Sequence, residues 1–138
     1  MFYRASVTKR GKAWLVTFPD CDGCVTEAGT RADAIKGAHE ALNGWLEAHL
    51  VQGNAPPRAR PRAKGHLIEV APQLSTVLQL RWRREELELT QGQLAKRAGV
   101  SQQQIAKLED PDGNPTMASL EKIALALGLR LDVRFTAA

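Results

Sequence analysis

The stretch from Thr90 to Glu109 constrains the fold of this chain more than any other part of the sequence. A hydroxyl residue is followed three positions later by glutamine at Thr90–Gln93 and again at Ser101–Gln104. Each pair is a capping box, which marks the first turn of a helix. Gly99 lies between the two helices and permits a tight turn. The apolar positions converge inside the corner: Leu94, Ala98, Val100, Ile105 and Leu108. This spacing predicts a helix-turn-helix.

The second helix of such a motif places its N-terminal residues at base edges in the major groove. Those residues are Gln102 and Gln103, whose amides donate and accept and so match N6 and N7 of adenine. Lys107 follows on the same face. Gln91 begins the preceding helix, where backbone N–H groups and the helix dipole favour a phosphate oxygen. The predicted DNA-binding residues are Gln91, Ser101, Gln102, Gln103 and Lys107; for each glutamine, the alternative is a solvated surface amide.

The first half of the chain predicts a small antiparallel sheet with one long helix. Residues 2–9 and 13–18 are rich in β-branched and aromatic residues and indicate a hairpin, and residues 24–27 indicate a third short strand. Thr30 is a good N-cap for an amphipathic helix over about residues 31–50. Residues 67–70 are a further strand candidate that can return to this sheet. We therefore expect an α+β protein.

The second half is almost wholly helical in pattern, with one exception at its end. Helices are expected from Leu74 onward, and Thr116 can cap a last helix that Gly128 stops. Leu129 to Phe135 then alternates apolar with charged residues, which predicts a short strand with one solvent-exposed face. Because a helical domain offers such a strand no partner, we expect it to pair between subunits.

Net charge describes the connector between the two halves. The chain holds 19 Lys and Arg against 15 Asp and Glu, a net charge of +4. Residues 1–57 and 65–138 are each neutral by count, so the excess comes from a Pro-rich loop at 55–65 that carries Arg58, Arg60, Arg62 and Lys64. Three interpretations stay open for this loop: it is a flexible solvated connector, it contacts the DNA backbone, or it binds RNA or an acidic partner.

Other chemistry finds little support in the sequence. Cys21 and Cys24 have the spacing of a zinc knuckle, but a structural zinc site takes four ligands and no second cysteine pair exists. The carboxylates at positions 20, 22, 27 and 33 crowd into one turn and one helix start, where turn formation and capping explain them. We therefore expect no enzyme, no metal and no cofactor.

The sequence also predicts where the protein acts. Two cysteines are too few to stabilise a chain of this length by disulfide bonds, which favours a reducing compartment. The longest apolar run, Ile123 to Leu129, is far shorter than the roughly 20 residues of a membrane span. We expect a cytoplasmic protein without a membrane partner.

Two resemblances join these observations. Residues 74–128 resemble the Cro/lambda-repressor type of helix-turn-helix domain, including Leu108-Glu109 and Asn114-Pro115-Thr116. Residues 1–72 are similar to the N-terminal domain of HicB antitoxins. That similarity rests on Phe18-Pro-Asp-Cys-Asp-Gly-Cys24, Thr26, Gly29-Thr30, Ala34-Ile35 and His66 to Val70. The chain departs from the HicB pattern at Cys21, where an apolar residue is usual, and in its more basic Pro-rich loop.

The resemblance to HicB implies a function for each half. HicB proteins of this form bind HicA, a small RNA-cleaving toxin, through an N-terminal domain with a partial ribonuclease H fold that lacks ribonuclease activity. They repress their own operon through the helix-turn-helix. Residues 1–72 would then bind toxin and residues 73–138 would bind operator DNA as a homodimer or higher oligomer. Toxin-contact candidates, which turn formation also explains, are Phe18, Pro19, Asp20, Gly23 and Cys24.

A second function stays open at this point. A stand-alone helix-turn-helix repressor could carry an N-terminal domain that senses a small ligand instead of a toxin.

Overall fold

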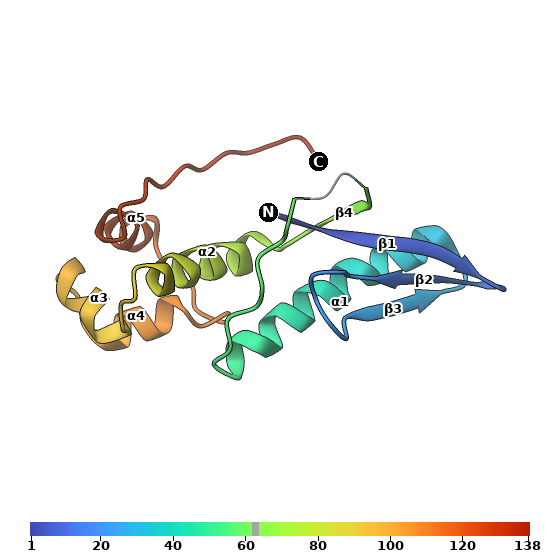
Figure 1. Cartoon of the computed structure of the whole chain (residues 1–138). Helices are drawn as coiled ribbons and strands as arrows, with labels where there is room; N and C mark the ends of the chain where they lie inside the picture. The colour runs from blue at the N-terminus through green and yellow to red at the C-terminus, as the bar shows by residue number, and fades with distance from the viewer. Residues whose placement is uncertain (62–63) are drawn as a thin grey trace. The chain divides into compact units, whose positions relative to one another are not determined.

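The computed structural model describes residues 1–61 and 64–138, which form two compact units at residues 1–76 and 77–138. The first unit contains β1 (Phe2–Arg10), β2 (Ala13–Thr17), β3 (Val25–Ala28), α1 (Arg31–Val51) and β4 (His66–Glu69) (Figure 1). The helices that follow are α2 (Pro72–Glu86), α3 (Gln91–Ala98), α4 (Gln102–Leu108) and α5 (Met117–Ala126). The predicted α+β class is confirmed.

The strands of the first unit form one antiparallel sheet in the order β3-β2-β1-β4. Gly11, with φ of 60°, makes the turn between β1 and β2. The last strand returns to the sheet beside the first, with Tyr3 opposite Ile68. The hairpin, the third strand and the return of the fourth are therefore present as the sequence patterns predicted.

One long helix covers one face of this sheet. The Oγ1 atom of Thr30 accepts a hydrogen bond from the backbone N–H of Asp33 and caps the start of α1. The buried residues of the helix recur every fourth position: Ala34, Ala38, Leu42, Leu46 and Leu50. They pack with buried residues of the strands that face them, including Tyr3, Ala5, Val16 and Ile68. Among the described residues of this unit, no helix covers the opposite face of the sheet (Figure 1).

Part of the basic Pro-rich loop is fixed to the first unit. The Tyr3 hydroxyl donates a hydrogen bond of 2.7 Å to the carbonyl oxygen of Pro57. Arg60 binds the buried Asp20 carboxylate through its Nε atom at 2.6 Å and through its backbone N–H at 3.1 Å. Arg60 thus serves the fold of its own unit. Arg62 lies outside the described residues.

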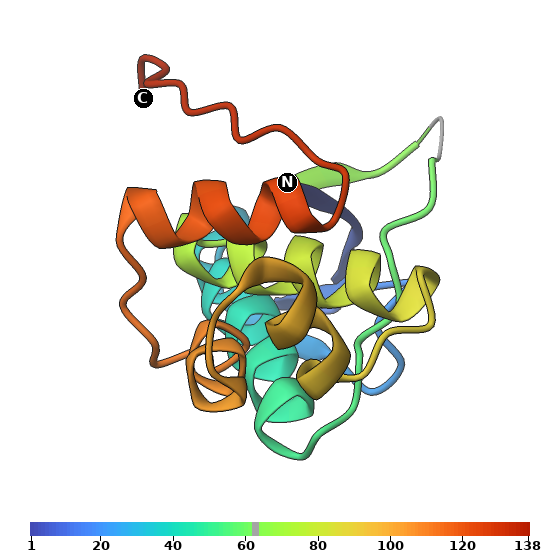
Figure 2. The same cartoon turned by 90° about the vertical axis from the view of Figure 1, so that its left-hand side faces the viewer.

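The second unit has a helical core of its own. Its buried apolar residues come from α2, α3, α4 and α5 and from the residue after α5: Leu80, Leu94, Ala95, Ile105, Leu108, Leu120, Ile123 and Leu127. Ala98 and Val100 pack against this cluster, so the predicted apolar corner is confirmed. Figure 2 looks onto these helices.

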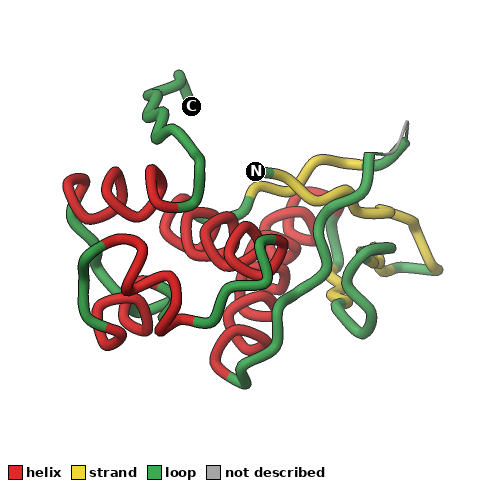
Figure 3. The backbone as a smooth tube through the Cα atoms, turned by 60° about the vertical axis from the view of Figure 1, so that its left-hand side comes forward, coloured by secondary structure: helices red, strands yellow, loops and turns green. Residues whose placement is uncertain are grey.

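The strand predicted for Leu129 to Phe135 is wrong for the single chain. No secondary structure forms from residue 129 to residue 138 (Figure 3). Leu129 and Leu131 pack against the helical core, whereas Val133 is 51% exposed and Phe135 is 100% exposed. A strand is defined by hydrogen bonds to a neighbouring strand, and this unit supplies none.

The loop after α4 contains a glycine that no other residue can replace without movement. A Cβ atom added to Gly113 would overlap the carbonyl oxygen of Lys107 and lie 3.0 Å from that of Asp110. Both are backbone atoms, so Gly113→Ala should lower the free energy of unfolding by about 2 kcal/mol, measured by urea denaturation. Gly44→Ala is the control, because nothing lies within 4 Å of a Cβ there and alanine favours a helix. Equal effects of the two substitutions would contradict this account.

Candidate functional site

The helix-turn-helix is built from two reciprocal capping boxes. Thr90 Oγ1 accepts from the Gln93 backbone N–H at 3.1 Å, and Gln93 Oε1 accepts from the Thr90 N–H at 2.9 Å. Ser101 and Gln104 exchange the same two bonds at 3.2 and 3.0 Å. Gly99 ends α3 in the left-handed conformation with φ of 67°. These local bonds fix where α3 and α4 begin and allow Leu94 and Ile105 to meet in the core.

The N-terminus of α4 presents a row of exposed polar side chains. Ser101, Gln102, Gln103 and Lys107 are all exposed, while Ile105 between them is buried. Within the described part of the chain, neither the Gln102 nor the Gln103 amide has an intramolecular hydrogen-bond partner. The Gln102 Oε1 atom lies near the start of α3, 3.4 Å from where a Cβ on Gly92 would be. Four of the five predicted DNA-binding residues therefore share one accessible surface.

Gln91, the fifth, has a different environment. Its Nε2 atom donates a hydrogen bond of 2.6 Å to Glu109 Oε2. Because this amide is already engaged, contact of Gln91 with phosphate stays a prediction only for its backbone N–H group.

Glu109 is the centre of a polar network that the sequence patterns did not reveal. Its carboxylate is buried and accepts from Arg84 Nε at 2.5 Å and from Arg84 Nη2 at 3.1 Å. Arg84 Nη1 also donates to the Leu89 carbonyl oxygen at 2.7 Å. The network joins α2, the start of α3 and the end of α4. Arg84 and Glu109 are 25 positions apart, so no local spacing could have paired them.

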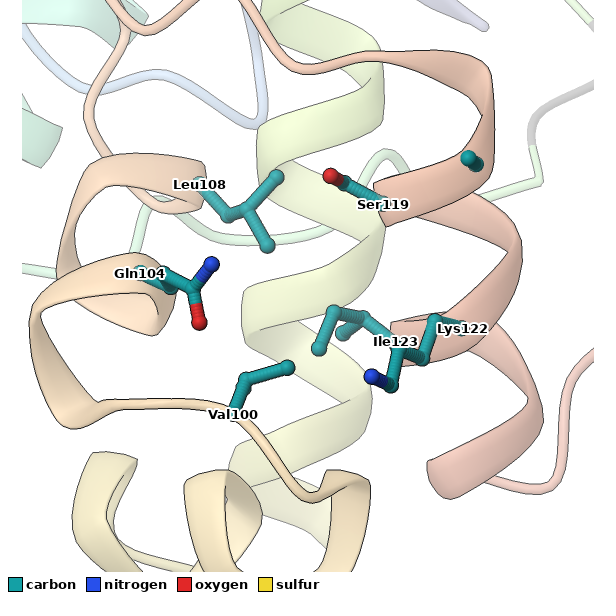
Figure 4. Close-up of a pocket in the computed structure, with 7 residues that line it drawn as sticks. Val100, Gln104, Leu108, Ser119, Lys122 and Ile123 are labelled. Atoms are coloured by element: carbon teal, nitrogen blue, oxygen red, sulfur yellow. The ribbon is translucent and has the colours of Figure 1, made fainter.

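A small hollow lies between α4 and α5 (Figure 4). Its volume is about 190 Å³, and Val100, Leu108 and Ile123 form its apolar part, with Gln104, Ser119 and Lys122 among its polar lining. Pockets that hold drug-sized ligands are about 300 Å³ or larger. The hollow is therefore a surface feature beside the recognition helix and a poor match for a cofactor.

The turn after β2 in the first unit holds the predicted toxin-contact residues, but most of them face inward. Phe18, Asp20 and Cys24 are buried, whereas Pro19 and Gly23 are exposed. Backbone bonds from Cys21 N to Phe18 O and from Cys24 N to Cys21 O fold the turn. Only the exposed pair is directly available to a partner protein.

Burial also decides the state of the two cysteines. Both are free and buried. Burial raises the pKa of the Cys21 thiol to about 12, with the nearby Cys24 and Asp20 adding to the rise, and it raises the pKa of Cys24 to about 11. Both thiols are protonated at neutral pH and are poor nucleophiles. Among the described residues, no three His, Cys, Asp or Glu side chains gather where they could hold a metal ion.

An open apolar surface lies on the sheet face that α1 does not cover. Strand alternation puts Phe2 and Arg4 of β1, Leu67 and Glu69 of β4, and Val25 of β3 on this face. Phe2, Val25 and Leu67 are 48%, 53% and 47% exposed. The sequence patterns did not single out these residues, because alternation shows which side chains share a face of one strand but not which strands lie side by side.

Comparisons with known proteins match both units. Residues 3–69 match the family of HicB-like antitoxins of bacterial toxin-antitoxin systems, and residues 80–133 match the helix-turn-helix family. Together the two matches support a HicB-family antitoxin with a helix-turn-helix. The antitoxin match spans the sheet and α1, and the DNA-binding match extends from α2 to Val133.

Curated relatives agree with this assignment over most of their length. Antitoxin HicB 1 of Photorhabdus laumondii is 28% identical over 118 residues, covering 86% of this chain and 76% of the relative. Antitoxin HicB of Escherichia coli is 26% identical over 121 residues, covering 87% of this chain and 88% of the relative. None of the described helices is long and apolar enough to cross a membrane.

The Arg84–Glu109 pair gives a test of how the recognition helix is held. Glu109→Ala would leave a buried guanidinium without its carboxylate, and we expect the free energy of unfolding to fall by about 3 kcal/mol. Glu121→Ala, at an exposed position of α5, should change it by less than about 0.5 kcal/mol. Chemical denaturation measures both. A loss at Glu109 no larger than at Glu121 would show that the pair does not hold the helices.

Proposed function

We propose that this antitoxin neutralises a HicA-like, RNA-cleaving toxin by direct binding and represses its own operon. The observation that carries the proposal is the presence, in one chain, of a HicB-like domain and a helix-turn-helix with two unengaged glutamine amides on its recognition helix. Toxin binding is assigned to residues 1–72 and DNA binding to residues 73–138. The protein acts in the cytoplasm by binding alone, with no enzymatic step.

DNA recognition follows from the surface of α4. Its N-terminus enters the major groove, where Gln102 and Gln103 reach base edges and Lys107 reaches a base or a phosphate. Each bidentate amide–adenine pair discriminates against a wrong base by about 1–3 kcal/mol. Residues 77–138 carry nine basic and eight acidic side chains, so the unit is close to neutral and its affinity for an operator must come from specific contacts more than from net charge. A homodimer presents two such helices to a palindromic operator.

Toxin binding is assigned to the open face of the sheet. Exposed apolar side chains grouped on one face mark protein-binding surfaces more often than scattered ones do. Phe2, Val25 and Leu67 supply the apolar contact, and Arg4 and Glu69 supply polar contacts beside them. Pro19 and Gly23 extend the candidate surface at the turn after β2.

Co-purification tests the toxin partner. When the chain is co-expressed with a HicA-like toxin, we expect a stable complex. Leu67→Glu should weaken that complex at least tenfold by isothermal titration, since a charge would enter an apolar contact. Val51→Glu is the matched control, because Val51 is 69% exposed but lies on α1. Absence of any complex with the wild-type chain would overturn the toxin assignment.

Operator binding tests the recognition residues. Replacing Gln102 and Gln103 together with alanine should reduce the preference for the chain's own promoter over a scrambled duplex at least tenfold. Weak binding to both duplexes should remain, because phosphate contacts are unchanged. Gln52→Ala, an exposed glutamine at the end of α1, serves as the control in the same fluorescence-anisotropy titration. Unchanged discrimination in the double variant would remove the assigned readout.

A further inference from the structure

Strand β1 is longer than the strand that pairs with its outer edge. β4 lies opposite Phe2 to Ala5 only, and the chain bends at residues 64 and 65, just before β4 begins. Residues 6–10 of β1 are paired with β2 on their inner edge. In the described ranges 1–61 and 64–138, no strand pairs with residues 6–10 on the outer edge. About half of β1 is therefore an open sheet edge.

The hydrogen-bond pattern shows which backbone groups point out of this open edge. The backbone N–H of Val70 donates to the Met1 carbonyl oxygen at 3.0 Å, which continues the β1–β4 register by one position. Bonded and non-bonded positions alternate along an antiparallel pair, so residues 3 and 5 also direct their backbone groups toward β4. Continued along β1, the same alternation directs the N–H and C=O groups of Val7 and Lys9 outward. The residues between them face β2.

A groove runs beside these outward-facing groups. Its volume is about 390 Å³, and its walls are residues 5–8 of β1, Gly65 and His66 at the start of β4, and Arg31 of α1. Sites that hold a ligand of drug size have volumes of about 300–1,000 Å³. The groove therefore has room for a short stretch of extended chain next to the open edge.

The charge along this edge is positive. β1 carries Arg4, Lys9 and Arg10 and no acidic residue. The Arg4 guanidinium donates a hydrogen bond of 3.0 Å to the Gly65 carbonyl oxygen, so it is held beside the groove. Arg31 adds a further cation to the wall of the groove. Because cross-strand pairs of opposite charge are favourable, a strand that enters here should be acidic.

Two other partners match the edge less well. A second copy of β1 would crowd Lys9 and Arg10 of both chains along one edge, and like charges across strands are destabilising. An RNA phosphate accepts hydrogen bonds and donates none, so it would leave the outward carbonyl oxygen of Val7 without a donor. A polypeptide strand supplies both donors and acceptors.

We propose that the outer edge of β1 over residues 6–10 binds an extended, acidic segment of a partner protein by strand addition. The backbone of that segment pairs with Val7 and Lys9. Its carboxylates lie on the α1 side of the sheet, where they meet Lys9 and Arg31, because the buried Tyr3 and Ala5 place the odd-numbered residues of β1 on that side. The site goes beyond the proposed function, since it uses neither the recognition helix nor the apolar side chains on the open face of the sheet.

Peptide selection on the full-length chain tests the chemistry of the partner. Random displayed peptides of about seven residues, long enough to span residues 6–10, are selected on the wild type and depleted on Val7→Pro. We expect the retained peptides to alternate acidic with β-branched residues and to lack proline. Retention of no peptide in preference by the wild type, or retention of basic peptides, would overturn the proposal.

Substitutions at position 7 separate the backbone group from the side chain. Val7→Pro removes an N–H group that the sheet does not use, and proline is tolerated at outward positions of an edge strand. Val7→Ala is the matched control, because it also removes the valine side chain but keeps the N–H. In fluorescence-anisotropy titrations, a retained acidic peptide should bind Val7→Pro at least about tenfold more weakly than Val7→Ala. Equal affinities would overturn strand addition.

Charge reversal tests the carboxylate contact in the same titration. Arg31→Glu should weaken the acidic peptide at least about tenfold, and an acidic residue in the first turn of a helix does not destabilise the fold. Lys36→Glu is the control, because it makes the same change in net charge at an exposed position of α1 that does not line the groove. Equal losses in the two variants would show that net charge alone attracts the peptide.

Hydrogen exchange on the unchanged chain gives a readout that does not depend on any variant folding. The Val7 and Lys9 amides should exchange rapidly in the free protein and at least about tenfold more slowly with the peptide bound, whereas the Thr8 amide, which faces β2, should be protected in both. Protection of Val7 and Lys9 in the free protein at every concentration would show that the edge is already covered. Protection that appears only as the free protein is concentrated would assign the edge to a second copy, and protection by a mixed-sequence RNA oligonucleotide in place of the peptide would assign it to RNA.

Discussion

The buried ion pair between Arg84 and Glu109 is the interaction on which the DNA-binding unit depends. A charge taken out of water is costly unless a partner of opposite sign and hydrogen bonds replace the solvent. Glu109 has two bonds from Arg84 and one from Gln91, which together satisfy its carboxylate. These groups come from α2, the start of α3 and the end of α4. A movement of the recognition helix would therefore separate the Glu109 carboxylate from its donors and leave a buried charge without a partner. The exposed amides of Gln102 and Gln103 are therefore carried on a helix whose far end is fixed.

The antitoxin unit uses the same physical device in another place. Asp20 is buried at the turn after β2 and is bound by Arg60, forty positions away. This contact turns one of the excess basic residues into part of the fold, so net charge is a poor guide to the partner of this protein. It also changes the meaning of the motif around Asp20. Phe18, Asp20 and Cys24 shape a turn, and the accessible apolar side chains lie on the open face of the sheet.

In both units, one set of residues holds the elements in place and another set is exposed on their surface. In the second unit, the capping boxes and the Glu109 network hold α3 and α4 in place, while Gln102, Gln103 and Lys107 are exposed on α4. In the first, the row of buried residues on α1 supports a sheet whose other face stays open. The C-terminal segment is the exception, since Leu129 and Leu131 pack against the helical core whereas Val133 and Phe135 are exposed.

The sequence by itself determined the elements whose signals are local. Capping boxes, the αL glycine at position 99 and period-two or period-four apolar patterns act over a few residues, so the strands, α1 and the helix-turn-helix could be predicted from them. Tertiary structure alone decided which polar residues are exposed and which are internal. The partners of Glu109 and Asp20 lie 25 and 40 positions away, and burial of a carboxylate depends on every element packed around it. The strand predicted at Leu129 failed for the same reason, because a strand exists only where another strand completes its hydrogen bonds.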